Sequence, residues 1–243
     1  MQVKKEWFAS WFDSPYYHIL YKNRDHSEAN LFINNLLSSL QPKNKAKVLD
    51  LACGKGRHSF VMAQNGLDVL GADLSPQSIE TAKSMESENL KFIVHDMRQA
   101  VEQNHFDYIF NLFTSFGYFS QFVDNLHTIN SIHYSLKKEG ILVLDFFNAV
   151  KTILNLKPTD QFTIDGVDFE IERKVSNGII QKTIYINDKG DCKHFEERVQ
   201  ALVLEDFKAY MYNKFKILNL YGNYNLDPFD EQNSDRLIIV AVK

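Results

Sequence analysis

The spacing of hydrophobic residues along the chain changes several times, and each change predicts a different element. Residues 28–40 carry apolar side chains three and four apart, the spacing of a helix with one buried face. Short apolar runs, which we interpret as strands, follow at 47–52, 67–73, 90–96, 106–113 and 141–147. Amphipathic segments between them predict helices over 57–66, 75–85 and 124–140. Ser75 is the expected N-cap of the second of these helices, with Pro76 in its first turn. Near-continuous apolar strands that alternate with helices are typical of a parallel sheet covered on both faces.

After Phe147 the pattern becomes that of an antiparallel sheet. Strand-like segments at 162–175, 179–187 and 194–204 alternate with the turn signals Asp165-Gly166, Asn177-Gly178 and Lys189-Gly190. A helix over 205–214 and two apolar strands, 215–222 and 236–243, then return as a hairpin to the main sheet. We therefore predict an α/β fold with a mostly parallel sheet, helices on both faces and a small antiparallel β insertion. Its expected parts are 1–150, 151–203 and 204–243, with the middle part as a substrate cap.

Length, charge and cysteine content narrow the class of protein. The 243 residues suit one large domain, or a domain with an insertion. The net charge of −4 argues against a nucleic-acid partner, since such proteins show a basic face. No apolar run has the length of a membrane span, and the N-terminus lacks the apolar core of a secretory signal. Two distant cysteines predict no disulfide framework, so we expect a cytoplasmic protein. A monomer and a homodimer both remain open.

The segment VLDLACGKGRH, residues 48–58, joins the first predicted strand to a helix through two glycines. Ligands of open α/β sheets bind at such turns, where glycine lets them approach the backbone. A pyrophosphate-binding turn has the pattern G-x-G-x-x-G, but Ser59 stands at the third glycine position. Asp50 would repel a pyrophosphate and would attract an ammonium group. S-adenosylmethionine carries an ammonium and a carboxylate and no phosphate, which suits Asp50 and the helix N-terminus.

The turn at 48–58 resembles the first motif of class I S-adenosylmethionine-dependent methyltransferases. VLGADLS at 69–75, FIVHDMR at 92–98 and FDYIFNLFTSFGYF at 106–119 are similar to the next three motifs, in the same order and at strand ends. The closer likeness is to bacterial small-molecule members that have a small β insertion before the sixth strand. The resemblance implies a Rossmann-like seven-stranded sheet, with S-adenosylmethionine as the cofactor.

The same resemblance implies which residues contact the cofactor. Asp73 would bind both ribose hydroxyls, and Asp96 would lie near the adenine amino group. The N-terminal stretch YYHILYKNRD resembles the segment that closes over the cofactor, so Tyr21 and Arg24 would bind the methionine carboxylate. The complete expected set is Tyr21, Arg24, Asp50, Ala52, Cys53, Gly54, Gly56, Asp73, Leu74, Asp96, Met97, Asn111 and Phe113.

Methyl transfer from a sulfonium is an in-line displacement, so alignment and exclusion of water can be sufficient without a general base. Where a base is needed, our candidates are Tyr17, His18, Tyr118 and Tyr224. Cys53 has no adjacent base and is interpreted as a small buried residue rather than a nucleophile. The eight histidines show no metal-ligand spacing, so we predict no metal site. A pocket capped by the insertion favours a small acceptor, methylated on nitrogen or oxygen.

Two other interpretations remain open from the sequence. One is a non-catalytic S-adenosylmethionine-binding regulatory module, because intact binding motifs do not prove turnover. The other is an NAD-dependent oxidoreductase, which Asp50 and Ser59 disfavour. A nucleic-acid methyltransferase would show a basic face, and usually an Asn/Asp-Pro-Pro-aromatic motif where this chain has NLFTSF.

Overall fold

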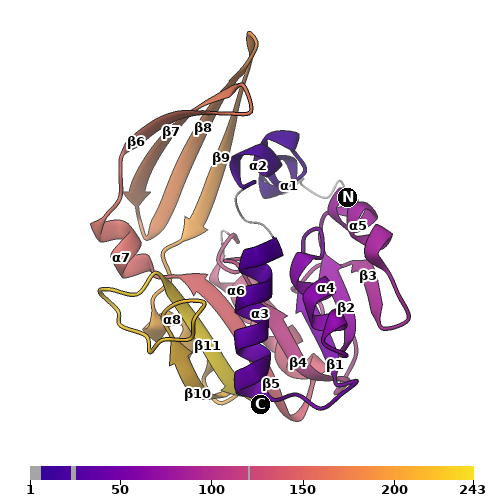
Figure 1. The fold of residues 1–243 in the computed structure, drawn as a ribbon. Coiled ribbons are helices and arrows are strands. Elements are labelled where there is room, and N and C mark those ends of the chain that lie inside the picture. The colour runs from indigo at the N-terminus through magenta and orange to yellow at the C-terminus, as the bar shows by residue number, and fades with distance from the viewer. Residues whose placement is uncertain (1–6, 23–25, 120) are drawn as a thin grey trace.

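A computed structural model describes residues 7–22, 26–119 and 121–243, and they form two β-sheets with helices around them (Figure 1). The larger sheet has seven strands in the order β10-β11-β5-β4-β1-β2-β3. Strand β11 runs antiparallel to both of its neighbours, and the other paired strands are parallel. The strands are β1 (Lys47–Leu51), β2 (Asp68–Asp73), β3 (Leu90–Val94), β4 (Phe106–Asn111), β5 (Leu136–Phe147), β10 (Lys216–Tyr221) and β11 (Arg236–Val242). The predicted mostly parallel sheet is confirmed.

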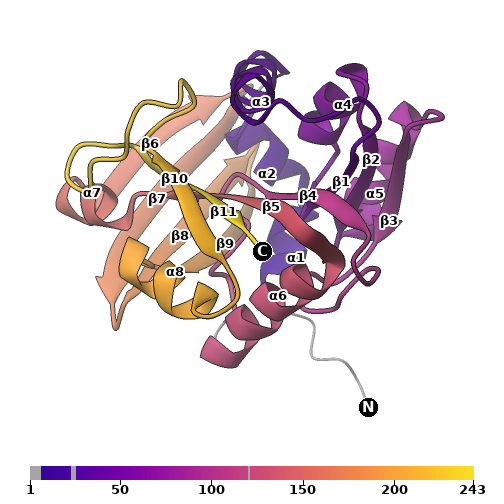
Figure 2. The ribbon, with the colours of Figure 1, turned by 90° about the horizontal axis from the view of Figure 1, so that it is seen from below.

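Helices cover both faces of this sheet, because each buries an apolar stripe against it. One face carries α3 (His26–Leu40), α4 (Arg57–Gln64) and α5 (Pro76–Ala82), which is followed by the short 3₁₀ helix Lys83–Met85. The other face carries α6 (Phe122–Ser135) and α8 (Leu204–Met211) (Figure 2). The predicted cap of α5 is confirmed, since Ser75 accepts a hydrogen bond from the Ser78 amide at 3.0 Å.

The largest differences from the prediction are two element boundaries and one additional helix. Helix α6 ends at Ser135, not at Gly140, because Leu136 is fully buried and pairs with Phe106 as the first residue of β5. The last strand of the insertion ends at Gln200 rather than Leu204. The short helix α7 (Ala149–Leu154) was not predicted, although Asn148 caps it. In these places, strand pairing or a helix cap decided where an element begins or ends, and the hydrophobic pattern alone did not.

The insertion forms a second sheet of β6 (Thr159–Ile164), β7 (Val167–Ser176), β8 (Ile179–Asp188) and β9 (Asp191–Gln200), all antiparallel. Its three hairpins turn at the predicted dipeptides Asp165-Gly166, Asn177-Gly178 and Lys189-Gly190. All six of these residues have positive φ, from 51° to 95°. Positive φ at both central residues defines a type I′ turn, whose twist matches that of the strands.

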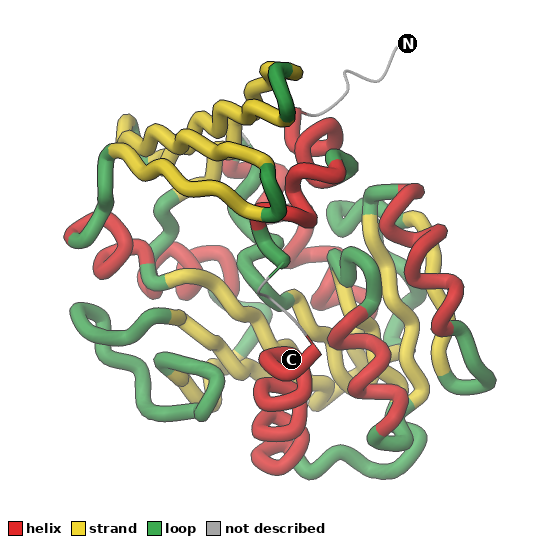
Figure 3. Tube along the Cα trace, turned by 45° about the horizontal axis from the view of Figure 1, so that its top comes forward, coloured by secondary structure: helices red, strands yellow, loops and turns green. Residues whose placement is uncertain are grey.

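The N-terminal helices α1 (Trp7–Phe12) and α2 (Pro15–Leu20) lie beside this second sheet (Figures 1 and 3). Trp11 and Tyr16 are buried against Phe169 and Ile184 of the inner sheet face. We call α1 and α2 the lid helices, because they also border the pocket described below. No helix in the described part of the chain is long and apolar enough to cross a membrane.

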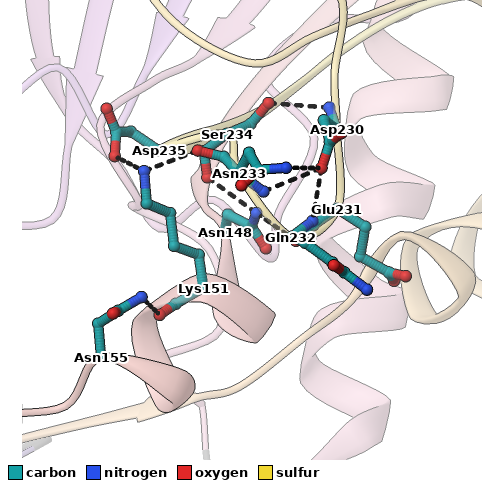
Figure 4. A network of polar contacts seen from close by, with 9 residues as sticks. All are labelled: Asn148, Lys151, Asn155, Asp230, Glu231, Gln232, Asn233, Ser234 and Asp235. Carbon is teal, nitrogen blue, oxygen red and sulfur yellow. Dashed lines mark hydrogen bonds and ion pairs between the residues drawn. The ribbon is translucent and has the colours of Figure 1, made fainter.

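The long loop between β10 and β11 is fixed against α7 (Figure 4). The Asn148 side chain donates to the carbonyl oxygens of Glu231 and Ser234 at 2.7 and 2.8 Å. Lys151 forms an ion pair with Asp235 at 2.6 Å and also donates to the Asn233 carbonyl. These contacts give the loop a defined position beside the insertion.

Candidate functional site

The carboxyl ends of β1, β2, β3 and β4 border one pocket of about 670 Å³. Strand order reverses between β1 and β4, and ligands of open α/β sheets bind at such a reversal. Residues of the loops that follow these strands line one side, and residues of the lid helices line another. The volume falls within the range of small-molecule and cofactor sites.

The glycine turn after β1 forms an open cradle in the pocket. Gly54 has a φ of +56°, and no atom lies within 4 Å of the position that a Cβ would occupy there. Ala52 also has positive φ. Gly56 has a different role: it begins α4, and a Cβ there would lie 2.6 Å from the Phe92 ring. Gly54 therefore provides room for a ligand, whereas Gly56 permits close packing.

Asp50 is buried at the end of β1 and borders the pocket. Ser59, on the first turn of α4, donates a hydrogen bond of 2.5 Å to its Oδ2 atom. Burial raises the pKa of Asp50 to about 6, although the Ser59 bond lowers it in part, and the nearby Asp73 adds to the rise. A buried carboxyl group that ionises this close to neutrality is suited to a cationic ligand.

Asp73 at the end of β2 is held by two backbone amides. Gly54 N donates to Oδ2 and Ser75 N donates to Oδ1, both at 2.8 Å. Each carboxylate oxygen keeps a further lone pair for a donor from the pocket. Burial raises the pKa of Asp73, and the two amide bonds act against that rise. The Asp73 carboxylate is thus hydrogen-bonded directly to the glycine turn after β1.

Asp96 follows β3 and lines the pocket, and its main partner is Arg98. Arg98 Nε and Nη2 donate to the two Asp96 oxygens at 3.0 and 2.6 Å. Burial alone would raise the pKa of Asp96, but the Arg98 hydrogen bonds hold it below its usual value. Met97 borders the pocket beside it and supplies an apolar surface.

The lid side of the pocket is aromatic. Tyr17 and His18 of α2 and Tyr21 just after it line the pocket, as do Tyr118 and Phe119 of the loop after β4. Burial, together with the positive charge of Lys55, lowers the pKa of His18, and Asp13 acts in the opposite direction. His18 is thus a neutral imidazole at pH 7, with a nitrogen that can accept a proton.

Two residues of the loop after β4 are in a strained conformation. Phe113 and Thr114 have φ values of 62° and 59°, which are rare for residues with a bulky or branched side chain. Asp145 at the end of β5 accepts from the Phe113 amide at 2.8 Å and from Arg236 Nε at 2.7 Å. Arg236 Nη2 also donates to Thr114 Oγ1 at 3.0 Å. This buried ion pair fixes the turn that presents both residues to the pocket.

The structure brings most of the expected cofactor residues together. Those that line the pocket are Tyr21, Asp50, Ala52, Cys53, Gly54, Asp73, Leu74, Asp96, Met97 and Phe113. Asn111 does not line it: the side chain is buried and donates to the Leu51 carbonyl at 2.9 Å. Gly56 packs on Phe92, as described above, and Arg24 lies outside the described residues.

Three of the four candidate bases, Tyr17, His18 and Tyr118, line the pocket. Tyr224 does not line it: its ring stacks on Phe32 at 4.2 Å. Tyr21 borders the pocket, and its hydroxyl donates to Glu197 of β9.

Sequence reasoning missed His58, which is buried on the first turn of α4 and lines the pocket. Burial, with the charge of Arg57, lowers its pKa to about 3, so the imidazole is neutral. Its position two residues after Gly56 could have indicated this, because the first turn of this helix borders the pocket. Cys53 borders the pocket, and burial raises the pKa of its thiol, which agrees with an inert side chain.

Comparisons with known proteins agree with this geometry. Residues 42–202 match a family model described as "Methyltransferase domain". A putative methyltransferase, YqeM of Bacillus subtilis, is 34% identical over 127 residues, 51% of each chain. A glycine/sarcosine/dimethylglycine N-methyltransferase of Actinopolyspora halophila is 25% identical over 92% of this chain and 40% of its own length. This chain thus spans about half the length, or less, of these two relatives.

Among solved structures, an S-adenosylmethionine-dependent methyltransferase from Clostridium acetobutylicum superposes with a TM-score of 0.78. The two chains share 19% identity over 97% of each, so this likeness shows the fold. The shared fold includes the lid helices and the second sheet as well as the large sheet, because the match spans nearly the whole chain.

Proposed function

Because this chain belongs to the family of S-adenosylmethionine-dependent methyltransferases, we propose that it methylates a nitrogen or oxygen atom of a small molecule. The observation that carries this proposal is the position of the lid helices. They place Tyr17 and His18 on the same pocket as Asp50 and Asp73. A pocket covered by the lid helices has room for a small acceptor beside the cofactor. A polymer could reach the cofactor only if the lid helices moved aside.

The residues present fit the cofactor. The open cradle at Gly54 offers space, the buried Asp50 suits the ammonium group, and Asp73 has lone pairs free for the ribose hydroxyls. The first turn of α4 has no side-chain cap and borders the pocket, so its N-terminal end suits the carboxylate. When bound, S-adenosylmethionine supplies an activated methyl group, so the protein must align the acceptor and exclude water.

The aromatic lid side fits an amine acceptor in particular. Rings of Tyr17, Tyr118 and Phe119 provide faces that attract a cationic amine before it loses its proton. We expect His18, which lines the same pocket as a neutral imidazole, to take that proton. The named activity of the Actinopolyspora relative, N-methylation of glycine and its derivatives, supports an amine.

The test is production of S-adenosylhomocysteine with panels of small amines, small alcohols and phenols, and bulk tRNA. We expect turnover with small amines or hydroxyl compounds and none with tRNA. Binding of S-adenosylmethionine, S-adenosylhomocysteine and NAD is measured in parallel by calorimetry. Turnover with tRNA alone would refute the small-molecule proposal, and the absence of S-adenosylmethionine binding would refute the choice of cofactor.

Binding of S-adenosylmethionine is expected to weaken below pH 6. Asp50 has a pKa of about 6 in the free protein, so it is ionised at pH 7 and mostly protonated at pH 5. The ammonium group favours the ionised form, and affinity should therefore fall up to about tenfold per pH unit below 6. Binding at pH 5 should release a proton, which calorimetry detects in buffers of different ionisation enthalpy.

The control for this pH dependence is Asp50→Asn. It should bind weakly at every pH and lack the step near pH 6. A wild-type affinity that is constant from pH 5 to 8 would contradict the assigned role of Asp50.

A further inference from the structure

The carboxylate of Glu197, on β9 of the second sheet, accepts hydrogen bonds from side chains of both lid helices. Trp11 Nε1, on α1, donates to Glu197 Oε1 at 2.5 Å. The Tyr21 hydroxyl, at the C-terminal end of α2, donates to the same oxygen at 2.9 Å. Trp11 and Tyr21 precede Glu197 by 186 and 176 positions in the chain, and both bond its side chain.

Lys182 balances the charge of Glu197. It is the cross-strand neighbour on β8, and its Nζ atom lies 3.2 Å from Glu197 Oε2 and 2.5 Å from the Tyr21 hydroxyl. The two charged side chains are only 15% and 13% exposed. Hydrogen bonds to a charge in such an enclosed site are strong and directional, and an unpaired partner there is costly.

An apolar cluster surrounds this polar contact. The Trp11 indole is fully buried, and its ring lies 4.9 Å from that of Phe195 on β9 and 5.5 Å from that of Tyr17. Tyr16 is buried on the same face of the sheet. The second sheet therefore holds the lid helices through a broad apolar contact with Glu197 at its edge.

The lid helices also border the pocket. Tyr17, His18 and Tyr21 line it, whereas no described residue of β6–β9 does. The lid meets the large-sheet side through a hydrogen bond from Ser75 to Asp13 and an edge contact between the Phe12 and Tyr118 rings, 5.3 Å apart. The second sheet therefore fixes the position of the lid helices.

We propose that Glu197 is a positioning residue that holds both lid helices over the cofactor pocket and so sets how tightly and how long S-adenosylmethionine is retained. The second sheet acts on the pocket through the lid and forms no part of its wall. This inference rests on the cofactor and not on the acceptor, so it is independent of which small molecule is methylated.

The test compares Glu197→Gln with Glu196→Gln. Glu196 is the preceding residue, on the opposite face of β9, where it pairs with Arg198 in an exposed position. We expect Glu197→Gln to weaken S-adenosylmethionine binding about tenfold by calorimetry and to speed the release of S-adenosylhomocysteine in stopped-flow experiments. Glu196→Gln should match the wild type in both measurements.

Limited trypsin digestion reports on the lid directly. Lys22, half-exposed just after α2, is a cleavage site between the lid and α3. Saturating S-adenosylhomocysteine should protect the wild type and Glu196→Gln at this bond, and should protect Glu197→Gln much less. The cleaved bond is identified from the masses of the two fragments.

Two results would overturn the inference. The first is a folded Glu197→Gln variant that has a lower melting temperature but a wild-type dissociation constant and release rate, because Glu197 would then only stabilise the fold. The second applies where Glu197→Gln does not fold: Trp11→Phe, which removes one donor to Glu197 and keeps an aromatic ring, should then weaken binding about threefold. An unchanged affinity in that variant would refute the role. A wild-type protein without affinity for the cofactor would instead refute the proposed function.

Discussion

Asp73→Ala is expected to reduce the affinity for S-adenosylmethionine by a factor of 100 or more while the protein stays folded. The carboxylate oxygens have lone pairs free for two ribose hydroxyls, and hydrogen bonds to a charged group contribute about 1.5–3 kcal/mol each. The loss of both corresponds to a factor of roughly 10² to 10⁴ in the dissociation constant. Removal of Asp73 also frees the amides of Gly54 and Ser75, so the cradle loses its anchor.

Calorimetric titration of both S-adenosylmethionine and S-adenosylhomocysteine measures this effect. The matched control is Asp68→Ala, at the exposed start of the same strand, which should bind both compounds like the wild type. An Asp73→Ala variant that keeps an affinity within threefold of the wild type would show that the ribose is held elsewhere.

Breaking the buried pair of Asp145 and Arg236 is the second change with a large expected effect. Arg236→Met leaves the carboxylate of Asp145, which is fully buried, without its charged partner. Removal of one member of a buried ion pair costs about 3–5 kcal/mol of stability. For a chain of this length the melting temperature should fall by about 10 °C. The strained turn at Phe113 and Thr114 also loses a support, so cofactor affinity should fall as well.

Two further variants separate stability from positioning. The double variant Asp145→Leu, Arg236→Met removes both charges and should recover much of the lost stability. It should still bind the cofactor poorly, because the Phe113 amide has lost its acceptor. Arg198→Met, which breaks the exposed pair with Glu196, should change the stability by less than about 1 kcal/mol. Wild-type affinity in the double variant would show that the ion pair has no part in shaping the pocket.

Features with a local physical cause could be predicted from the sequence. Three Xaa-Gly dipeptides fixed the positions of the hairpin turns, because type I′ geometry requires positive φ at both residues. Ser75 before Pro76 predicted the start of α5. Asp50, Asp73 and Asp96 share the pocket because parallel strands end at one edge of their sheet. Each of these depends on neighbours in the chain or on a rule of sheet topology.

Features that depend on distant contacts could not be predicted. The Tyr21 hydroxyl bonds Glu197, which no local pattern indicates. Asn111 turns its side chain inward, where the amide nitrogen donates to the Leu51 carbonyl and the amide oxygen is buried without a partner among the described residues. Leu136 joined a strand despite its helical neighbours, because Phe106 was available to pair with it. Support of the Phe113 turn by Arg236 involves residues on opposite sides of the insertion.

The type I′ hairpins also have a consequence for the order in which the molecule folds. Strands β6 to β9 pair with their immediate neighbours in the chain, so their contacts close short loops and form quickly. The large sheet must pair β1 with β4 across two intervening strands, which is slower. The lid helices dock on residues nearly two hundred positions away and need the second sheet as a template. We therefore expect a refolding chain to regain most of its secondary structure before the lid helices cover the pocket, and to regain the capacity to retain the cofactor last.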